Sequence, residues 1–496
     1  MMKAVVINRQ MKKYLIIFLI IIPGLLLSGR AAGRLLPPGQ PEYELLYDLY
    51  RRHEISGAYR TFNHNVAPYN LDRAAVTIDY PVPPAPDNNH IGILIQVTEA
   101  YRSARYARAR ANESFRGALI ADPIENVYLY GDFLIDEGLA EDPAYTGKIW
   151  RGFAGRVETA VASVTWRNFD FLFGRYGSFW GPVDHSLVLS ETARPMDAFS
   201  FRFLWGRFHF TYQFGKLVPL DNPAGPDTAF ENRFFAGHRL DIRLRENVRI
   251  GLFETIVFGG PGRSPDLSYL NPFLSFHAVQ LNEDIDDNTF LGADFSFYHA
   301  ERYKIYGQLL IDDFQVDDDT RGDQEPGEIG LVFGLQALDL PGSIDLHTEY
   351  LRIANRTYNQ RLTRNRYVNR GQFIGHEFGP DGDRTMISIT RWFHDNDRVV
   401  LNLSYQRRGE GNDDDFWDDP WLQVDQYDES FPTGVVEKTL TASGCFDGII
   451  AGRFFLSLET GLMRIFDFEN RAGENRSVPF FEARLSLLLP ILAPVD

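Results

Sequence analysis

The chain has 496 residues, with 50 Lys and Arg against 67 Asp and Glu, so its formal net charge is −17 at pH 7. This acidic balance argues against nucleic acid as a partner, because a phosphate backbone is bound by clustered basic side chains. Beyond the first thirty residues, no stretch approaches the ~18 consecutive apolar residues of a membrane-spanning helix, which excludes a helical membrane protein.

The first 32 residues have the pattern of a secretory signal peptide whose working start we place at Met11. A short basic segment at Met11–Lys13 precedes an apolar run over 14–27, and small residues around Ala32 supply a cleavage site. A membrane anchor would need a longer apolar run than these roughly 14 residues. We therefore expect an exported protein.

Residues 33–120 are expected to form a short helical and connecting segment. Tyr43, Leu46 and Tyr50 share one face of a predicted helix, and Asn70 could cap the start of a second one. The proline-rich stretch 80–89 is typical of a connector.

The stretch 91–111 carries two competing patterns. Its isoleucines alternate as in a strand from Ile91 to Ile95, whereas Arg102, Arg105 and Arg108 recur at helical spacing. We favour a helix with these arginines on a solvated face, and the alternative for them is a surface that binds an anionic ligand.

Residues 121–496 have the pattern of a large antiparallel transmembrane β-barrel, which places the chain in the all-β class. From Phe199 to Trp205 aromatic residues alternate with polar ones, and the phase resets after Gly206-Arg207, as a tight hairpin requires. An aromatic face of this kind suits a wall with lipid outside and water inside. About 20 residues per strand give roughly 16–18 strands.

Charged residues on one face of a predicted strand indicate a water-filled lumen. Arg239, Asp241, Arg243 and Arg245 alternate with aliphatic residues. The alternation breaks at Glu254, where we expect a bulge or a strand end.

Three further features of the barrel follow from the sequence. The single cysteine, Cys445, cannot form an internal disulfide and is expected to be a small wall residue. The final strand is expected to stop before Pro490. The longer connections are acidic and are expected to face outside; they are 282–288, 312–328 and 409–428.

The sequence resembles the Wzi-type capsule assembly proteins over most of the mature chain. The marks of the resemblance are Gly174–Pro182, Leu187–Ser190, Arg239-Leu240, Leu267–Pro272, Asp287-Asn288 and Tyr306–Asp313. The resemblance implies an outer-membrane barrel preceded by a small helical region. It also implies a lectin-like, non-catalytic protein that binds capsular polysaccharide or exopolysaccharide.

Four residues are candidates for ligand binding: Arg175, Trp180, Arg239 and Arg243. Trp180 could stack on a sugar while Arg175 donates hydrogen bonds to its oxygens. The more conservative interpretation is a strand ending in a glycine-proline turn, with Trp180 as a ring at the membrane interface.

No catalytic residue is assigned. His376-Glu377 lacks the second, helix-spaced histidine of a zinc motif. The acidic run 413–419 could bind calcium, although a solvated loop is the simpler interpretation. The expected partners are outer-membrane lipids, lipopolysaccharide, surface polysaccharide and, during biogenesis, the barrel-insertion machinery. A passive porin and a barrel enzyme acting on lipid or glycan are the alternative functions.

Overall fold

The computed structural model describes residues 35–36, 66–67, 69–70 and 90–494, except 104–109, 125–126, 143–144, 146, 184, 221–230, 314–323, 395–396, 413–419, 425–426 and 452–453. Within these residues a closed antiparallel barrel contains 18 strands, which confirms the predicted fold class and strand number. The strands are β4 (His90–Ser103), β5 (Arg110–Ile124), β6 (Val127–Asp136), β8 (Phe153–Trp166), β9 (Phe169–Tyr176), β11 (Met196–Trp205), β12 (Phe208–Leu217), β13 (Asn232–Arg245), β14 (Val248–Gly260), β15 (Asn288–His299), β16 (Tyr303–Asp313), β17 (Glu328–Leu340), β18 (Ile344–Ile353), β21 (Gly382–His394), β22 (Asp397–Arg408), β23 (Glu437–Ile450), β24 (Phe454–Phe466) and β25 (Arg476–Pro494).

Shorter elements accompany the barrel. In the described part of the chain, three short strand pairs form separate sheets that are not part of the barrel wall. They are β1 (Leu35–Leu36) with β3 (Tyr69–Asn70), β2 (Val66–Ala67) with β10 (Phe179–Trp180), and β19 (Val368–Asn369) with β20 (Gln372–Phe373). The two-residue β7 (Ile149–Trp150) pairs with β8. Two helices, α4 (Leu267–Leu270) and α5 (Phe276–Glu283), follow β14. No helix among the described residues is both long and apolar enough to cross a membrane.

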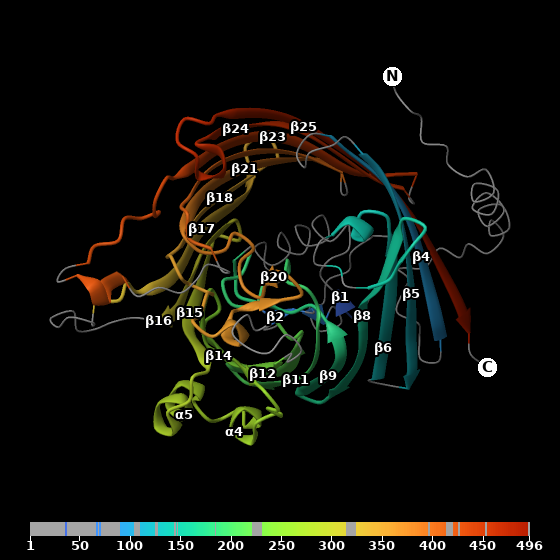
Figure 1. Cartoon of the computed structure of the whole chain (residues 1–496). Coiled ribbons are helices and arrows are strands. Elements are labelled where there is room, and N and C mark those ends of the chain that lie inside the picture. Colours follow the sequence, from blue (N-terminus) through green and yellow to red (C-terminus); the bar gives the residue numbers. More distant parts are fainter. Residues whose placement is uncertain are drawn as a thin grey trace.

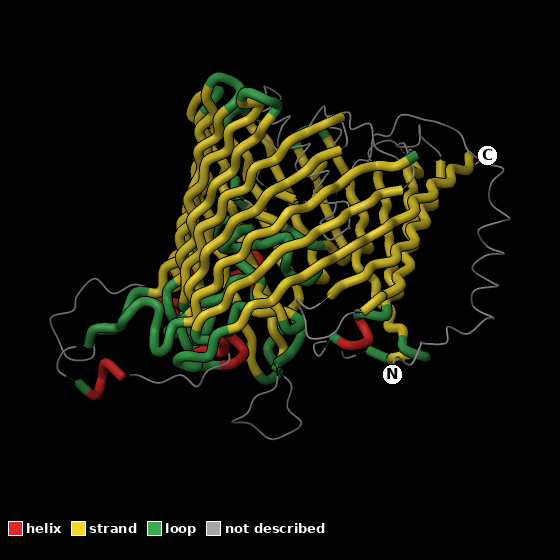
Figure 2. Tube along the Cα trace, turned by 90° about the horizontal axis from the view of Figure 1, so that it is seen from above, coloured by secondary structure: helices red, strands yellow, loops and turns green. Residues whose placement is uncertain are grey.

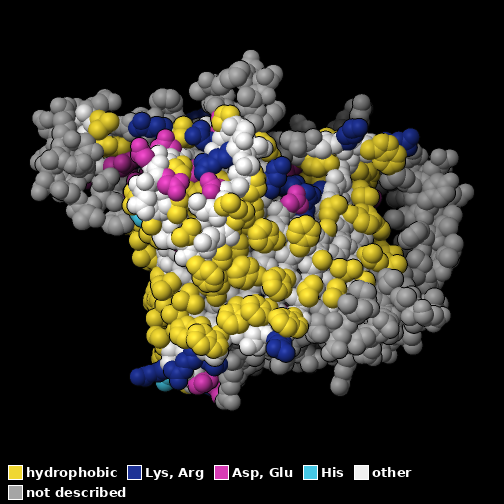
Figure 3. Space-filling model, turned by 90° about the horizontal axis from the view of Figure 1, so that it is seen from below, with side chains coloured by type: hydrophobic (Ala, Val, Ile, Leu, Met, Phe, Trp, Pro, Cys, Tyr) yellow, Lys and Arg dark blue, Asp and Glu magenta, His cyan; other side chains and the backbone are white. Residues whose placement is uncertain are grey.

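Alternation along the strands separates a lipid-facing side from a lumen-facing side. The predicted hairpin is confirmed, because Phe199 pairs with Phe214 and Trp205 with Phe208 across the turn at Gly206-Arg207. Outward rings are strongly exposed, as in Trp205 at 68%. Figure 3 shows the resulting apolar belt, with basic and acidic side chains above and below it. This is the pattern of a wall in contact with lipid.

Connections at the two ends of the barrel differ in length. Strand pairs such as β11–β12 and β13–β14 are joined by two residues, whereas the connections after β9, β12, β14, β16, β18 and β22 are long. The acidic segments predicted to face outside all belong to the long set. Figure 2 shows the helices gathered at this end of the tilted barrel, which we take as the extracellular end.

The helix favoured for 91–111 is wrong. Residues 90–103 form β4 and residues 110–124 form β5, and both belong to the barrel. Ile93 is exposed on the outer face, while Gln96 and Thr98 are buried on the inner face. The alternation of residues therefore indicated the correct secondary structure, and the spacing of the arginines did not. The barrel therefore begins before the boundary expected at residue 121.

The final strand does not stop before Pro490. Strand β25 continues to Pro494, and Pro490 pairs with Leu94 of β4. The pairing with β24 ends at Leu487, so among the described residues one side of β25 has no neighbouring strand from that point. A residue without an N–H group is tolerated at such an edge.

The bulge expected at Glu254 is absent, because the β13–β14 register runs unbroken past it. Glu254 faces outward but is covered by helix α5. Its Oε1 accepts hydrogen bonds from the backbone N–H of His277 at 2.6 Å and from the Ser275 hydroxyl at 3.1 Å. Its other oxygen lies 3.1 Å from the imidazole of His238. The helix thus shields a carboxylate on the lipid side of the wall.

Several expectations fall on residues outside the described parts of the chain. The signal peptide over 1–32 and the helix around Tyr43–Tyr50 lie outside the described residues, as does the segment after Asn70. Asn70 itself belongs to β3. Cys445 is an unpaired thiol on β23, as expected of a wall residue.

We predict that an arginine on the outer face of β22 destabilises the barrel far more than one on the inner face. Leu403 is exposed to lipid halfway along β22, and its neighbour Ser404 faces the lumen. Leu403→Arg should lower the free energy of unfolding in lipid vesicles by ~2–4 kcal/mol, because the cation enters hydrocarbon. Ser404→Arg is the matched control and should change it little. Equal losses would contradict the assigned faces.

Candidate functional site: the inward loops

Two long connections fold back into the barrel. The first inward loop, residues 177–195, carries β10, and the second inward loop, residues 354–381, carries β19 and β20. Figure 1 shows β2 and β20 inside the ring of strands. Strand β2 lies far upstream in the sequence and pairs with β10 through Phe179–Ala67 and Trp180–Val66. Strand β2 thus joins the first inward loop within the lumen.

The two inward loops are joined to each other by hydrogen bonds. The Tyr358 hydroxyl donates to the Leu187 carbonyl at 2.6 Å, and the Tyr367 hydroxyl donates to the Val188 carbonyl at 2.8 Å. Both rings have no exposed surface and belong to one apolar cluster with Leu187 and Val188. Because buried carbonyls need partners, these tyrosines both fill the interface and satisfy the backbone across it.

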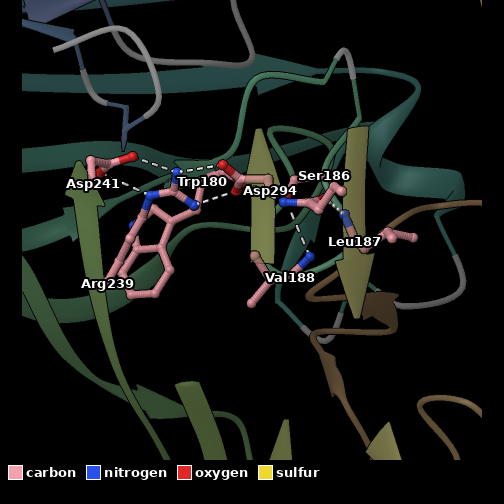
Figure 4. A network of polar contacts seen from close by, with 8 residues as sticks. Trp180, Ser186, Leu187, Val188, Arg239, Asp241 and Asp294 are labelled. Atoms are coloured by element: carbon pink, nitrogen blue, oxygen red, sulfur yellow. Dashed lines mark hydrogen bonds and ion pairs between the residues drawn. The ribbon is translucent and has the colours of Figure 1, made fainter. Parts of the chain in front are cut away.

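Gln308 of β16 fixes the first inward loop to the barrel wall. Its Oε1 accepts a hydrogen bond from the Leu187 N–H at 2.7 Å, and its Nε2 donates to the Trp180 carbonyl at 3.1 Å. The Ser186 hydroxyl also donates to Gln308 Oε1, at 3.2 Å. One amide side chain therefore satisfies a donor and an acceptor of the loop backbone at once. Figure 4 shows this part of the loop beside the charged residues of the wall.

Arg239 lies on the inner wall between two carboxylates. Its guanidinium donates to Asp241 at 2.6 Å and to Asp294 at 2.6 Å and 2.9 Å (Figure 4), and its side chain has no exposed surface. Gly251 stands between the two aspartates in the strand register. A Cβ atom at Gly251 would lie 2.1 Å from Arg239 Nη2, so the glycine leaves the space that the guanidinium occupies.

Arg233 of β13 supports the second inward loop, and nothing in the sequence pattern had indicated this role. It is fully buried, and it donates to the carbonyls of Arg364 at 2.6 Å and Val368 at 3.0 Å, and also to that of Arg366. A charged donor on several carbonyls orders an irregular backbone. The sequence signal is weak, because its partners in this loop are carbonyl groups more than 130 residues away.

A pair of histidines marks a second contact between the loops. The ring centroids of His185 and His376 are 5.6 Å apart. His185 also forms a hydrogen bond with the carboxylate of Glu191. Burial of His185 favours its neutral form, but the Glu191 carboxylate outweighs this and raises the pKa of His185 to about 10. Burial lowers the pKa of His376, and the charge of Arg384 adds to this effect. These effects favour the charged form of His185 and the neutral form of His376.

The four predicted ligand residues are not brought together at one point. Trp180 is fully buried within the first inward loop, so it is neither an interfacial ring nor an accessible platform for a sugar. Arg239 is enclosed by its two aspartates, and Arg243 is half-buried further along β13. Arg175 lies at the extracellular end of β9 and is paired with Asp197. Among the described residues, no three Asp, Glu, His or Cys side chains converge in a way that fits a metal ion.

We predict that Arg239→Met strongly destabilises the barrel. The change leaves Asp241 and Asp294 buried without their cation, which should cost ~3–5 kcal/mol of unfolding free energy. Arg243→Met, in the same strand at a half-buried position, should cost under about 1 kcal/mol. Urea titration of the refolded barrel in detergent measures both, and an equally mild effect of the two substitutions would refute the structural role of Arg239.

We predict that Gln308→Leu loosens the first inward loop without unfolding the barrel. The Leu187 N–H and the Trp180 carbonyl lose their partner, a penalty of ~1–3 kcal/mol for each buried group. Hydrogen exchange at the Leu187 amide should then accelerate by at least tenfold. Gln406→Leu, on the inner face of β22, should leave this amide protected. Unchanged protection in Gln308→Leu would show that the anchor is unimportant.

Comparisons with known proteins place the chain in a family. The family model for capsule assembly protein Wzi matches residues 99–477. A solved structure of Wzi from Escherichia coli, described as a carbohydrate-binding β-barrel involved in group 1 capsule assembly, is 15% identical, covers 94% of this chain and 100% of that chain, and has a TM-score of 0.61. OccK10 (OpdN) from Pseudomonas aeruginosa is 13% identical, covers 82% of this chain and 100% of that chain, and has a TM-score of 0.46.

No curated protein matches the sequence significantly. The E. coli structure shares the fold, and the family model spans most of the barrel, from β4 to the start of β25. The chain therefore belongs to the family of the capsule assembly protein Wzi, an outer-membrane β-barrel family.

Proposed function

We propose that this protein holds polysaccharide at the cell surface, as a non-catalytic, lectin-like protein of the outer membrane. The observation that carries the proposal is the joining of the two inward loops into one body fixed to the inner wall through Gln308 and Arg233. Such a body presents a fixed surface at the extracellular end, which suits binding to a polymer outside the cell. The related E. coli protein is described as carbohydrate-binding.

The remaining expectations are consistent with this role. Export through the signal peptide over 1–32 and folding by the barrel-insertion machinery would deliver the chain to the outer membrane. Lipopolysaccharide and other lipids would surround the apolar belt. Calcium bound by the acidic run 413–419 could bridge this loop to anionic glycans.

A passive channel is the alternative with a specific observation in its favour. Several lumen-facing positions on β22 to β24 are small or polar and only partly buried: Ser404, Gln406, Thr441, Ser457 and Glu459. A polar inner wall of this kind is found in water-filled barrels. The proposal of a surface-binding protein instead rests on the loops that occupy the opposite side of the lumen.

We predict that deleting the gene shifts surface polysaccharide from the cells into the medium. Complementation with the wild-type gene should restore cell-bound polymer, as should Gln406→Leu, whereas Gln308→Leu should restore it only partly because its binding surface is no longer fixed. Polymer is measured as uronic acid and total hexose in the cell and medium fractions. Unchanged retention after deletion, together with a steady conductance of the purified protein in planar bilayers, would favour the channel.

A further inference from the structure

Four arginines from four separate segments lie within electrostatic range of one another at the extracellular end of β8 and β9, where Asn369 of the β19–β20 hairpin donates a hydrogen bond to the Arg194 carbonyl at 3.5 Å. We call them the arginine cluster: Arg156 on β8, Arg175 on β9, Arg194 at the end of the first inward loop, and Arg370 at the tip of the β19–β20 hairpin. Arg370 interacts electrostatically with Arg175 and Arg156, and Arg194 interacts with Arg156 and Arg370. This concentration of positive charge is a local feature, since the chain as a whole has a net charge of −17.

Three members of the arginine cluster have a carboxylate partner. Arg175 donates to both oxygens of Asp197 at 2.8 Å and 2.7 Å. Arg156 is paired with Glu158, and Arg194 is paired with Asp142. Each of these guanidiniums is therefore neutralised within the protein.

Arg370 differs from the other three. Across the described part of the chain it has no ion pair or hydrogen bond, and its Nε is buried without a partner. Burial, followed by the nearby guanidinium of Arg175, lowers the pKa of Arg370. The carboxylates of Asp197 and Glu158 act in the opposite direction, but each is already paired, with Arg175 and Arg156. A half-buried cation without an ion pair of its own is unfavourable unless an anion joins it.

The hairpin turn does not itself require an arginine. Arg370 has φ of 52° and is followed by Gly371 with φ of 72°, as in a two-residue turn between antiparallel strands. Asn or Asp adopts the first position of such a turn more readily than Arg does. The turn is held by its neighbour, because Asn369 accepts a hydrogen bond from the Val218 N–H at 3.1 Å. The side chain of Arg370 is thus free to act on a ligand.

The position of the arginine cluster favours a ligand in the mouth of the barrel over a lipid in the membrane. Arg194 and Arg370 belong to the inward loops. Arg156 faces the lumen, since the next residue, Val157, is 43% exposed on the lipid side. Only Arg175 is on the outer face of the wall.

We propose that the arginine cluster binds an oxyanion, a carboxylate or a phosphate carried by a surface polysaccharide, with Arg370 in direct contact. The inference rests on the proposed polysaccharide function and adds the chemical class of the sugar. The planar guanidinium suits two parallel hydrogen bonds to such a group. The carboxylates near Arg370 are already engaged by Arg175, Arg156 and Arg194.

The test uses the full-length mature protein in detergent and polysaccharide extracted from the surface of its host. The polymer is compared in three forms: native, carboxyl-reduced, and dephosphorylated with hydrogen fluoride. We expect Arg370→Gln to weaken binding of the native polymer at least tenfold, as the loss of one charge-assisted hydrogen bond predicts. One of the two neutralised polymers should bind the wild-type protein equally weakly, which identifies the carboxylate or the phosphate.

Two further variants guard against an unspecific effect. Arg370→Lys keeps the charge without the planar fork and should retain intermediate binding. Arg471→Gln removes an exposed arginine of the β24–β25 connection and should leave binding unchanged. Heat-dependent migration in gels checks that each barrel is folded.

The possible contrary results are distinct. Equal binding of all three polymers, or full binding by Arg370→Gln, would overturn the anion site while leaving polysaccharide binding intact. Absence of binding by the wild-type protein to any form would overturn the proposed function and the site with it. Binding of lipid A in mixed micelles that depends on Arg370, without binding of polysaccharide, would assign the cluster to lipid and overturn the inference.

Discussion

Closure of the sheet is the constraint on which the rest of the structure depends. In hydrocarbon no water is available to bond backbone N–H and C=O groups, so a spanning sheet cannot keep an open edge. Here β25 closes on β4 from Phe481–Ser103 to Pro494–His90. The first and last strands of the barrel are thus the pair that removes the edge. Without β4 the sheet would have two open edges.

A closed wall has two environments, and charges are accommodated differently in each. On the inner side, Arg239 is buried but matched by two aspartates, and Gly251 makes room for it. On the outer side, Glu254 is tolerated because α5 covers it and supplies donors. Both arrangements follow from the same rule, that a buried charge must be paired and hydrogen-bonded.

The inward loops also have buried polar groups that must be paired, here within the lumen. Irregular backbone inside a barrel carries polar groups that neither strand pairing nor bulk water satisfies, and they need partners from elsewhere. Gln308 of β16, Arg233 of β13, and Tyr358 and Tyr367 of the second inward loop supply them. The loops are fixed as a result. Arg370 is then the exception, since it is the member of the arginine cluster that has no ion pair with any described residue.

The sequence by itself determined the barrel, its approximate strand number and the faces of its clearest strands, because a period of two is a local property of neighbouring residues. The hairpin at Gly206-Arg207 and the charged inner face of β13 could be predicted for that reason. The strand at β4 was missed because arginines at helical spacing competed with a clear alternation, and the continuation through Pro490 depended on where the pairing with β24 ends.

The site was decided by tertiary structure alone. Whether Trp180 is exposed, whether Arg239 is available to a ligand, and which arginine lacks a carboxylate all depend on residues that are tens to hundreds of positions apart in the chain. Sequence periodicity assigns a side chain to a face of its own strand. It cannot show which other segment folds against that face, because the partners meet only when the barrel closes and the long loops turn inward.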